Sequence, residues 1–346
     1  MPPHLPPRGA PDICWTTDRT AQSAVDYDVN RLILHGPAGV MNAKPQLRRS
    51  SDLPIEAERL LDALPTLPKV ALEVIRLVDS PFASAADLRR AVGEDAILTA
   101  RILQAVNAST HGLSRRIADI ERAILILGLN TVRNLAIITS AERFFQPRRE
   151  AGRFRSLANE LWRHATTTAS AAKLLAMELP EPHPYLTSEE FYVIGLIHDV
   201  GIMAELYSDR DRLIDAMERV QPLDDIARSE GSAPRKDLRA LEREVFGFDH
   251  AALGRRLCDR WQFPTFLLDG VGFHHSPMDA AEDAQPAAML VSIADRVAAS
   301  VPGGFADDLP SLEVDDEELA LIGLDEEALD RVRYQLQADL APAPRR

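Results

Sequence analysis

Apolar residues recur every three or four positions through most of the chain, which is the spacing of amphipathic α-helices. Residues 53–147 predict about five short helices in tandem. Two of these helices begin with a residue suited to an N-cap: Ser84, followed three positions later by Asp87, and Asp95. Gly128 separates the last two helices as a C-terminal stop. The pattern therefore predicts a helical first lobe.

A second, larger group of helices is predicted over residues 157–300. It opens with a long alanine- and threonine-rich helix over residues 157–177, followed by a strongly apolar helix over residues 191–207 that Ser188 would cap. Further helical patterns cover residues 211–220, 250–261, 266–275 and 287–299. No run of alternating β-branched residues is long enough for a sheet. The predicted fold class is all-α, with two helical lobes.

The two ends of the chain differ from this body. Residues 1–52 are rich in proline and show little periodicity, which predicts a disordered or loosely ordered N-terminal arm. The tail from Ser311 is strongly acidic but keeps apolar residues at helical spacing. Residues 311–340 are therefore predicted to form a helical appendage on the second lobe.

Composition narrows the classes of partner. The 346 residues carry a formal net charge of -14, which disfavours nucleic acid and anionic membranes as partners. A helix-turn-helix rhythm over residues 84–106 could indicate DNA binding, but that segment holds few basic residues. Cys14 and Cys258 are the only cysteines, so no disulfide framework is expected. Neither a signal peptide nor an uncharged membrane span stands out, which predicts a cytoplasmic protein.

The candidate chemistry centres on the apolar helix over residues 191–207, which carries His198 and Asp199 in its middle. A buried carboxylate costs several kcal/mol unless it is paired or bound to a metal. Other residues that could share a cation with this pair are Glu160, His164, His250, His274, His275 and Asp295. Mixed nitrogen and oxygen donors suit a divalent metal, with iron or manganese favoured over zinc or magnesium when carboxylates bridge two ions.

Glu160 and His164 are four residues apart and so lie on one helical face. Taken singly, each of these histidines could equally be an ordinary hydrogen-bonded residue, and Asp295 could pair with Arg296. The sequence does not single out a residue that would contact a phosphate or an acidic partner. Arg133 and the arginine-rich connection that includes Arg153 are the candidates.

Taken in order, a histidine, a His-Asp pair and a distant aspartate resemble the HD superfamily of metal-dependent phosphohydrolases, and the extra histidines resemble its HD-GYP branch. The match to HDOD domains is closer and spans roughly residues 55–300. It rests on LPTLPKVAL (residues 64–72), AILILG (123–128), LWRH (161–164), GLIHDVG (195–201) and RWQFP (260–264). The resemblance implies an all-α fold, and a role in bacterial signalling through protein partners. It also implies that His198, Asp199 and Asp295 are the main metal ligands, with Asp199 bridging.

Two positions depart from the active HD-GYP pattern. Ile202 stands where the active enzymes have a lysine after the His-Asp motif, and Ser276 and Pro277 stand where they have a glutamate and a Gly-Tyr-Pro loop. The resemblance thus implies that the metal ligands are kept while substrate recognition is lost. The sequence favours a regulatory module with little or no hydrolysis. A metal-dependent phosphohydrolase, or a binder of a small phosphorylated ligand, is the alternative.

Overall fold

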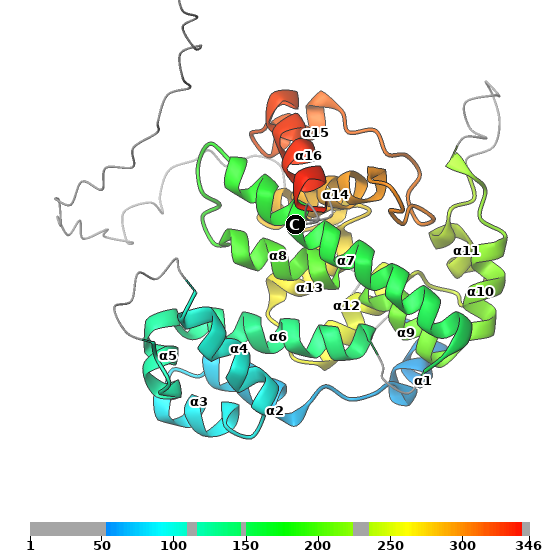
Figure 1. Ribbon diagram of the computed structural model, residues 1–346. Helices are drawn as coiled ribbons and strands as arrows, with labels where there is room; N and C mark the ends of the chain where they lie inside the picture. Colours follow the sequence, from blue (N-terminus) through cyan, green and yellow to red (C-terminus); the bar gives the residue numbers. More distant parts are fainter. Residues whose placement is uncertain (1–52, 109–115, 147–149, 224–234, 341–346) are drawn as a thin grey trace, which may run out of the picture. The chain divides into compact units, whose positions relative to one another are not determined.

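The computed structural model of the protein describes residues 53–108, 116–146, 150–223 and 235–340. Helices, almost all of them α-helices, are the regular elements of these residues, and no β-strand occurs among them (Figure 1). The predicted all-α fold class is confirmed. The N-terminal arm predicted over residues 1–52 lies outside the described residues.

In the part of the chain that the structure describes, the first lobe contains five helices: α2 (Lys69–Val78), α3 (Ala85–Val92), α4 (Ala96–Val106), α5 (Ile120–Leu127) and α6 (Leu129–Phe145). Its caps are those that the sequence predicts. Ser84 forms a capping box with Asp87, and the Asp95 carboxylate accepts hydrogen bonds from the first backbone amides of α4. Gly128 ends α5 with φ 80°, a conformation that favours glycine. Residues such as Leu88 and Ile102 are fully buried in a core that belongs to this lobe.

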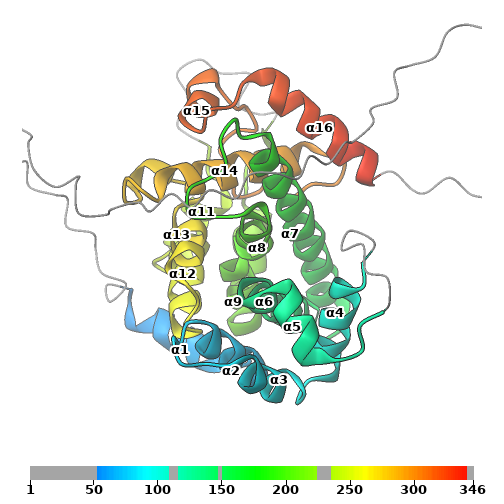
Figure 2. The same cartoon turned by 90° about the vertical axis from the view of Figure 1, so that its left-hand side faces the viewer.

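Helix α1 (Ile55–Ala63) precedes the first lobe in sequence but packs on the second lobe. Its buried Ala57 and Leu61 belong to the core of the second lobe, and α1 contacts α9. The Ser208 hydroxyl at the end of α9 donates a hydrogen bond to the Leu60 carbonyl (3.2 Å). In Figure 2, α1 lies beneath α12, on the same side of the second lobe. The chain therefore crosses from one lobe to the other along residues 64–68.

Among the described residues, the second lobe contains eight α-helices and the 3₁₀ turn η4. These are α7 (Gly152–Glu178), α8 (Ser188–Ile197), α9 (Val200–Ser208), α10 (Arg210–Glu218), α11 (Leu238–Val245), α12 (His250–Arg260), α13 (Thr265–Phe273), η4 (Pro277–Asp279) and α14 (Gln285–Ser300). Helix α11 and helix α1 were not expected from the sequence. The residue that caps α8 is Thr187, which forms a capping box with Glu190, and not Ser188. A break at His198 and Asp199 divides the predicted central helix into α8 and α9.

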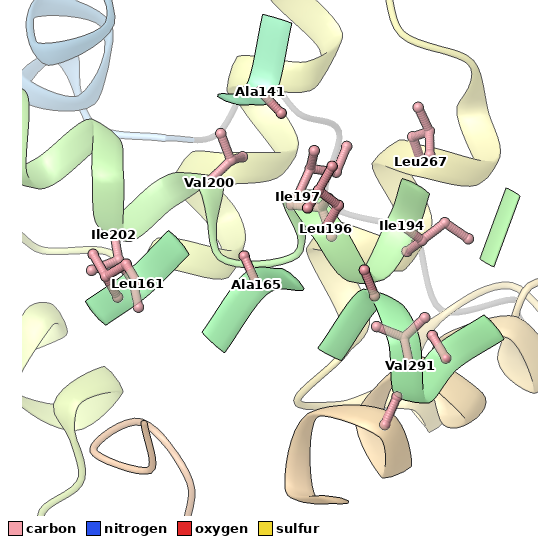
Figure 3. Close-up of a cluster of buried hydrophobic side chains, with 14 of the residues drawn as sticks. Ala141, Leu161, Ala165, Ile194, Leu196, Ile197, Val200, Ile202, Leu267 and Val291 are labelled. Atoms are coloured by element: carbon pink, nitrogen blue, oxygen red, sulfur yellow. The ribbon is translucent and has the colours of Figure 1, made fainter. Parts of the chain in front are cut away.

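Helix α8 lies in the interior of the second lobe, packed mainly on α7. Figure 3 shows Ile194 and Ile197 of α8 in one apolar cluster with Leu161 of α7, Leu267 of α13 and Val291 of α14. Residues Ser188–Ser208 are long and apolar enough to cross a membrane, but 83% of their most apolar window is buried inside the protein. The composition of this stretch is therefore that of a core element.

The tail after α14 forms two helices, α15 (Asp316–Leu321) and α16 (Glu326–Leu340). Helix α16 packs along α7, as the red and green helices in Figures 1 and 2 show. Leu329, Val332 and Leu336 supply its buried face, while its acidic residues are mostly exposed. The connection between α14 and α15 also contributes buried residues, among them Phe305, Asp308 and Leu309.

Candidate metal centre

Seven predicted ligands converge at the centre of the second lobe. They come from α7, from the break between α8 and α9, from the start of α12, from the end of α13 and from the middle of α14: His164, His198, Asp199, His250, His274, His275 and Asp295. All except His275 are at most 2% exposed, and the ring of His275 is 5% exposed. The structure thus brings these seven predicted residues together around His198.

The local backbone places these groups close together. Helix α8 ends at Ile197, and the turn through His198 and Asp199 directs both side chains to the same side before α9 begins. At Gly201 an added Cβ would lie 2.0 Å from the backbone oxygen of His250. The absence of a side chain at Gly201 therefore allows the first turn of α12 to lie directly against α9, which brings His250 next to Asp199.

Two groups of donors share Asp199. One consists of Asp199, His250, His274, His275 and Asp308, and the other of His164, His198 and Asp199, with Asp295 alongside. Asp199 Oδ1 lies 3.5 Å from Nε2 of His250 and 3.5 Å from Nε2 of His274. Asp199 Oδ2 lies 3.6 Å from His164 Nε2 and 3.1 Å from His198 Nε2. Because each oxygen faces a different set of imidazoles, Asp199 has the geometry of a bridging carboxylate.

Three of the histidines are fixed in one tautomer by hydrogen bonds on their outer side. Nδ1 of His198 donates to the Gly195 carbonyl (2.8 Å), and Nδ1 of His274 donates to the Val271 carbonyl (2.7 Å). Nδ1 of His250 donates to Oε2 of Glu242 (2.8 Å). Carbonyl and carboxylate oxygens can only accept, so the Nε2 lone pairs face inward, as in histidines that ligate metals.

Burial and mutual attraction perturb the ionisation of these groups. Burial opposes the cationic form of His198, but the carboxylates of Asp199 and Asp295 outweigh it and raise the pKa of His198 well above its usual range. Burial also opposes the ionised form of Asp199, yet His198 holds its pKa well below the ordinary value. For His250, the effect of burial is outweighed by Glu242, which raises the pKa to about 10. The buried carboxylates therefore have to be neutralised by positive charge, which either bound protons or a metal ion can supply.

The donor set fits divalent metal ions. Both oxygens of Asp199 and of Asp308, and Nε2 of His198 and of His274, are buried and lack a hydrogen-bond partner in bonding geometry. Buried polar atoms are nearly always partnered, and an unpartnered carboxylate is costly. Imidazole nitrogens and carboxylate oxygens at these separations are a ligand set for transition metals. The cluster therefore indicates a metal site.

Two acidic residues of this site were not predicted. Asp308 enters the cluster from the connection between α14 and α15, and its Oδ2 lies 3.2 Å from His275 Nε2. Glu242 of α11 is fully buried and orients His250 through the hydrogen bond that its Oε2 accepts from Nδ1 of that ring. Neither has a local signal, because Asp308 belongs to a stretch with many acids and Glu242 to a helix that was not predicted.

Three predicted site residues lie elsewhere. Glu160 is exposed and lies beside Ile214 and Met217 of α10, although Ala158 and Leu161 of the same turn of α7 are buried. Arg133 is buried and forms an ion pair with Glu190 (2.8 Å), so it is not available to a phosphate. Arg153 is exposed and pairs with Glu218 (2.6 Å).

An all-α lobe with histidines and aspartates converging from several helices defines an HD-type domain, and the sequence places it more narrowly. Residues 64–277 match the model of the HDOD domain family, and the chain belongs to that family.

Comparison with individual proteins agrees with this assignment. An uncharacterised protein from Treponema pallidum (strain Nichols) is 26% identical over 234 residues, which cover 68% of this chain but only 42% of that protein. This chain thus spans less than half the length of that relative.

Two solved structures share the fold. A proposed phosphohydrolase from Shewanella amazonensis SB2B is 22% identical with a TM-score of 0.56, covering 83% of this chain and 94% of the other. A proposed signal transduction protein from Marinobacter aquaeolei VT8 is 21% identical with a TM-score of 0.56, covering 84% of this chain and 60% of the other. The same fold therefore occurs in a proposed phosphohydrolase and in a proposed signal transduction protein. Because the fold does not decide between these two functions, the geometry of the site has to be used.

Proposed function

We propose that this protein is a bacterial, cytoplasmic signal-transduction module that acts through protein partners, and that its metal site has little or no hydrolytic activity. The observation that carries the proposal is the closure of the site. The side chains of His198, His250, His274 and Asp295 have no exposed surface, and that of Asp199 has 1%. A phosphoester must reach the metal-bound nucleophile and present its phosphoryl oxygens to the ions. The near-complete burial of these donors argues against access by such a substrate.

Two neighbouring positions support this proposal. Ile202 is fully buried in the apolar core of the second lobe, where active HD-GYP enzymes have a lysine that contacts phosphate. Directly after His275 the chain forms the short 3₁₀ turn Pro277–Asp279 in place of a Gly-Tyr-Pro loop. Arg133 and Arg153 are both engaged in ion pairs. Neither arginine is therefore available to bind a substrate phosphate.

When bound, the ions would hold the donor side chains together and could lower the pKa of a coordinated water. We propose iron or manganese, because Asp199 has bridging geometry and the remaining donors are imidazoles and carboxylates. His164, His198, Asp199 and Asp295 would hold one ion, and Asp199, His250, His274 and His275 the other. The site would then serve to stabilise the second lobe and to set its conformation.

The proposal is tested by elemental analysis of the purified protein together with a hydrolysis panel. The protein is reconstituted with Fe²⁺ or Mn²⁺ and assayed on p-nitrophenyl phosphate, bis-p-nitrophenyl phosphate and cyclic dinucleotides, with Asp199→Asn as the control variant. We expect about two bound ions per chain and no turnover above that of Asp199→Asn. Robust turnover that Asp199→Asn abolishes would establish the alternative, a metal-dependent phosphohydrolase. The absence of any bound metal would contradict the proposed site.

A further inference from the structure

The connection between α14 and α15 covers the metal site. We call residues 301–310 of this connection the closing segment; Figure 1 shows the connection as the orange trace after α14. The Phe305 side chain is buried against the ring of His164, with 5.8 Å between ring centroids. Asp308, three residues later, is fully buried and faces the opposite group of donors. The closing segment thus contacts both halves of the centre.

The position of Asp308 is that of a ligand. Its Oδ2 lies 3.2 Å from His275 Nε2 and 3.8 Å from His250 Nε2. It belongs to the five-residue group in which every donor atom lies within 4.8 Å of the others. Neither of its carboxylate oxygens has a hydrogen-bond partner. A carboxylate that is fully buried and receives no hydrogen bond is otherwise strongly unfavourable.

The charge balance supports the same assignment. When ionised, Asp199, Asp295, Asp308 and Glu242 bring four negative charges into one dry region. Two divalent cations would neutralise all four carboxylates, whereas without them protons bound by the histidines or by the carboxyl groups would have to do so. Without cations, Asp308 would have to be held near Asp199 and Asp295 against like-charge repulsion.

The main chain of the closing segment is clamped independently of Asp308. The Leu238 amide donates to the Asp307 carbonyl (2.8 Å), and an Arg163 guanidinium nitrogen donates to the Gly303 carbonyl (2.5 Å). Arg235 donates to the carbonyls of Ala306 and Leu309. Loss of the Asp308 contact therefore loosens a segment that other bonds still anchor, so a variant at this position should fold.

We infer that Asp308 is an additional metal ligand, supplied by the closing segment, and that bound metal holds this segment against the second lobe. This inference rests on the proposed metal site and goes beyond it, because it makes the docking of the closing segment depend on metal. It also explains why the site is closed, since Asp308 takes up coordination that a substrate or a water would need. The order of the closing segment would then report whether metal is bound.

The test compares full-length wild type with Asp308→Asn, and with Asp307→Asn as the matched control. Asp307 is the adjacent residue in the same segment, but it is only partly buried and lies outside the donor groups. Metal affinity is measured by competition with a chelator, and amide hydrogen exchange is followed by mass spectrometry over the closing segment and Leu238. Asp199→Asn serves as the variant that removes the bridging ligand.

In the wild type we expect metal removal to increase exchange in the closing segment. Asp308→Asn should weaken metal binding by about tenfold or more, and its closing segment should exchange fast with or without metal. Asp307→Asn should behave as wild type. A thermal melt of the metal-free proteins checks folding, where Asp308→Asn should be at least as stable as wild type because it removes a buried charge.

The outcomes separate the two proposals. If the wild type binds metal and Asp308→Asn matches it in affinity and exchange, Asp308 is not a ligand and only this inference is overturned. If the wild type binds no metal, and Asp199→Asn changes nothing, the metal site itself is wrong.

Discussion

Replacing Arg133 with methionine tests how the two lobes are held together. Arg133 of α6 and Glu190 of α8 form an ion pair (2.8 Å) whose side chains are 8% and 6% exposed. The other oxygen of Glu190 accepts hydrogen bonds from the Thr187 amide (2.9 Å) and hydroxyl (3.0 Å), so the carboxylate also completes the cap of α8. The guanidinium lies over the ring of Phe266, 5.4 Å from its centroid.

The magnitude follows from this environment. Removing one partner of a buried ion pair costs about 3–5 kcal/mol, because the remaining charge is left uncompensated. In Arg133→Met the Glu190 carboxylate keeps its two bonds from Thr187, so we expect a loss of about 3 kcal/mol, the lower end of that range. Glu190→Gln should cost a comparable amount, since Arg133 then keeps only Phe266 and the exposed Asp79 at 3.8 Å. The double variant should recover about 2 kcal/mol of the summed loss.

The assay is urea unfolding of the four proteins of this cycle, followed by circular dichroism. Arg153→Met is the matched control, because Arg153 and its partner Glu218 are both about 60% exposed and such surface pairs contribute about 0.2–1 kcal/mol. A loss below about 1 kcal/mol in Arg133→Met, or strict additivity in the double variant, would refute the reasoning. So would a loss of phosphate binding in Arg133→Met without any change in stability.

Three further predictions concern other parts of the molecule. Gly201→Ala should destabilise the protein by about 1–3 kcal/mol and reduce its metal content, because the new Cβ would meet the His250 backbone. A thermal melt measures the stability and elemental analysis the metal content. An unchanged melting temperature would contradict the prediction. The hydrogen bonds from Arg143 hold the pKa of Asp95 below its ordinary value. The ionised Asp95 therefore stabilises the fold at neutral pH, and this stabilisation is lost as the pH falls through the folded-state pKa. In urea unfolding, the free energy of unfolding should change less between about pH 6 and about pH 3 for Asp95→Asn than for wild type. Burial raises the pKa of the Cys258 thiol well above its ordinary value, so peptide mapping should find Cys258 alkylated only after unfolding. Rapid alkylation in buffer would contradict its burial.

Local signals in the sequence were sufficient for the helices of the first lobe and for the centre of the site. The caps at Ser84 and Asp95 and the stop at Gly128 depend on side chains and backbone within one turn, so they can be read without knowing the tertiary structure. His198 and Asp199 stood out because a polar pair in an apolar stretch needs compensation wherever the stretch is buried.

The parts that were missed depend on tertiary folding. The four-residue spacing of Glu160 and His164 correctly places them on one stripe of a helix, but it does not say which turns of that stripe other elements cover. Asp308 is one acid among many in an acidic region, and only the return of the chain over His164 selects it. Glu242 belongs to helix α11, which the sequence did not predict because its pattern covers only eight residues.

Helix α8 connects the metal centre with the contact between the lobes. Glu190 in its first turn binds Arg133 of the first lobe, and His198 directly after its last residue belongs to the donor cluster. These positions are eight residues apart, about 12 Å along a rigid helix that is buried on most of its surface. A change in the position of His198 on metal loss therefore acts on the same element that Arg133 holds.

The two perturbations should consequently be non-additive. We expect the stability lost on chelation to differ between wild type and Arg133→Met by about 0.5–2 kcal/mol, whereas Arg153→Met should lose the same amount as wild type. Urea unfolding of each protein with and without metal measures the difference. Additivity within about 0.5 kcal/mol would mean that α8 carries no coupling between the metal centre and the first lobe, and that the first lobe folds without regard to the state of the site.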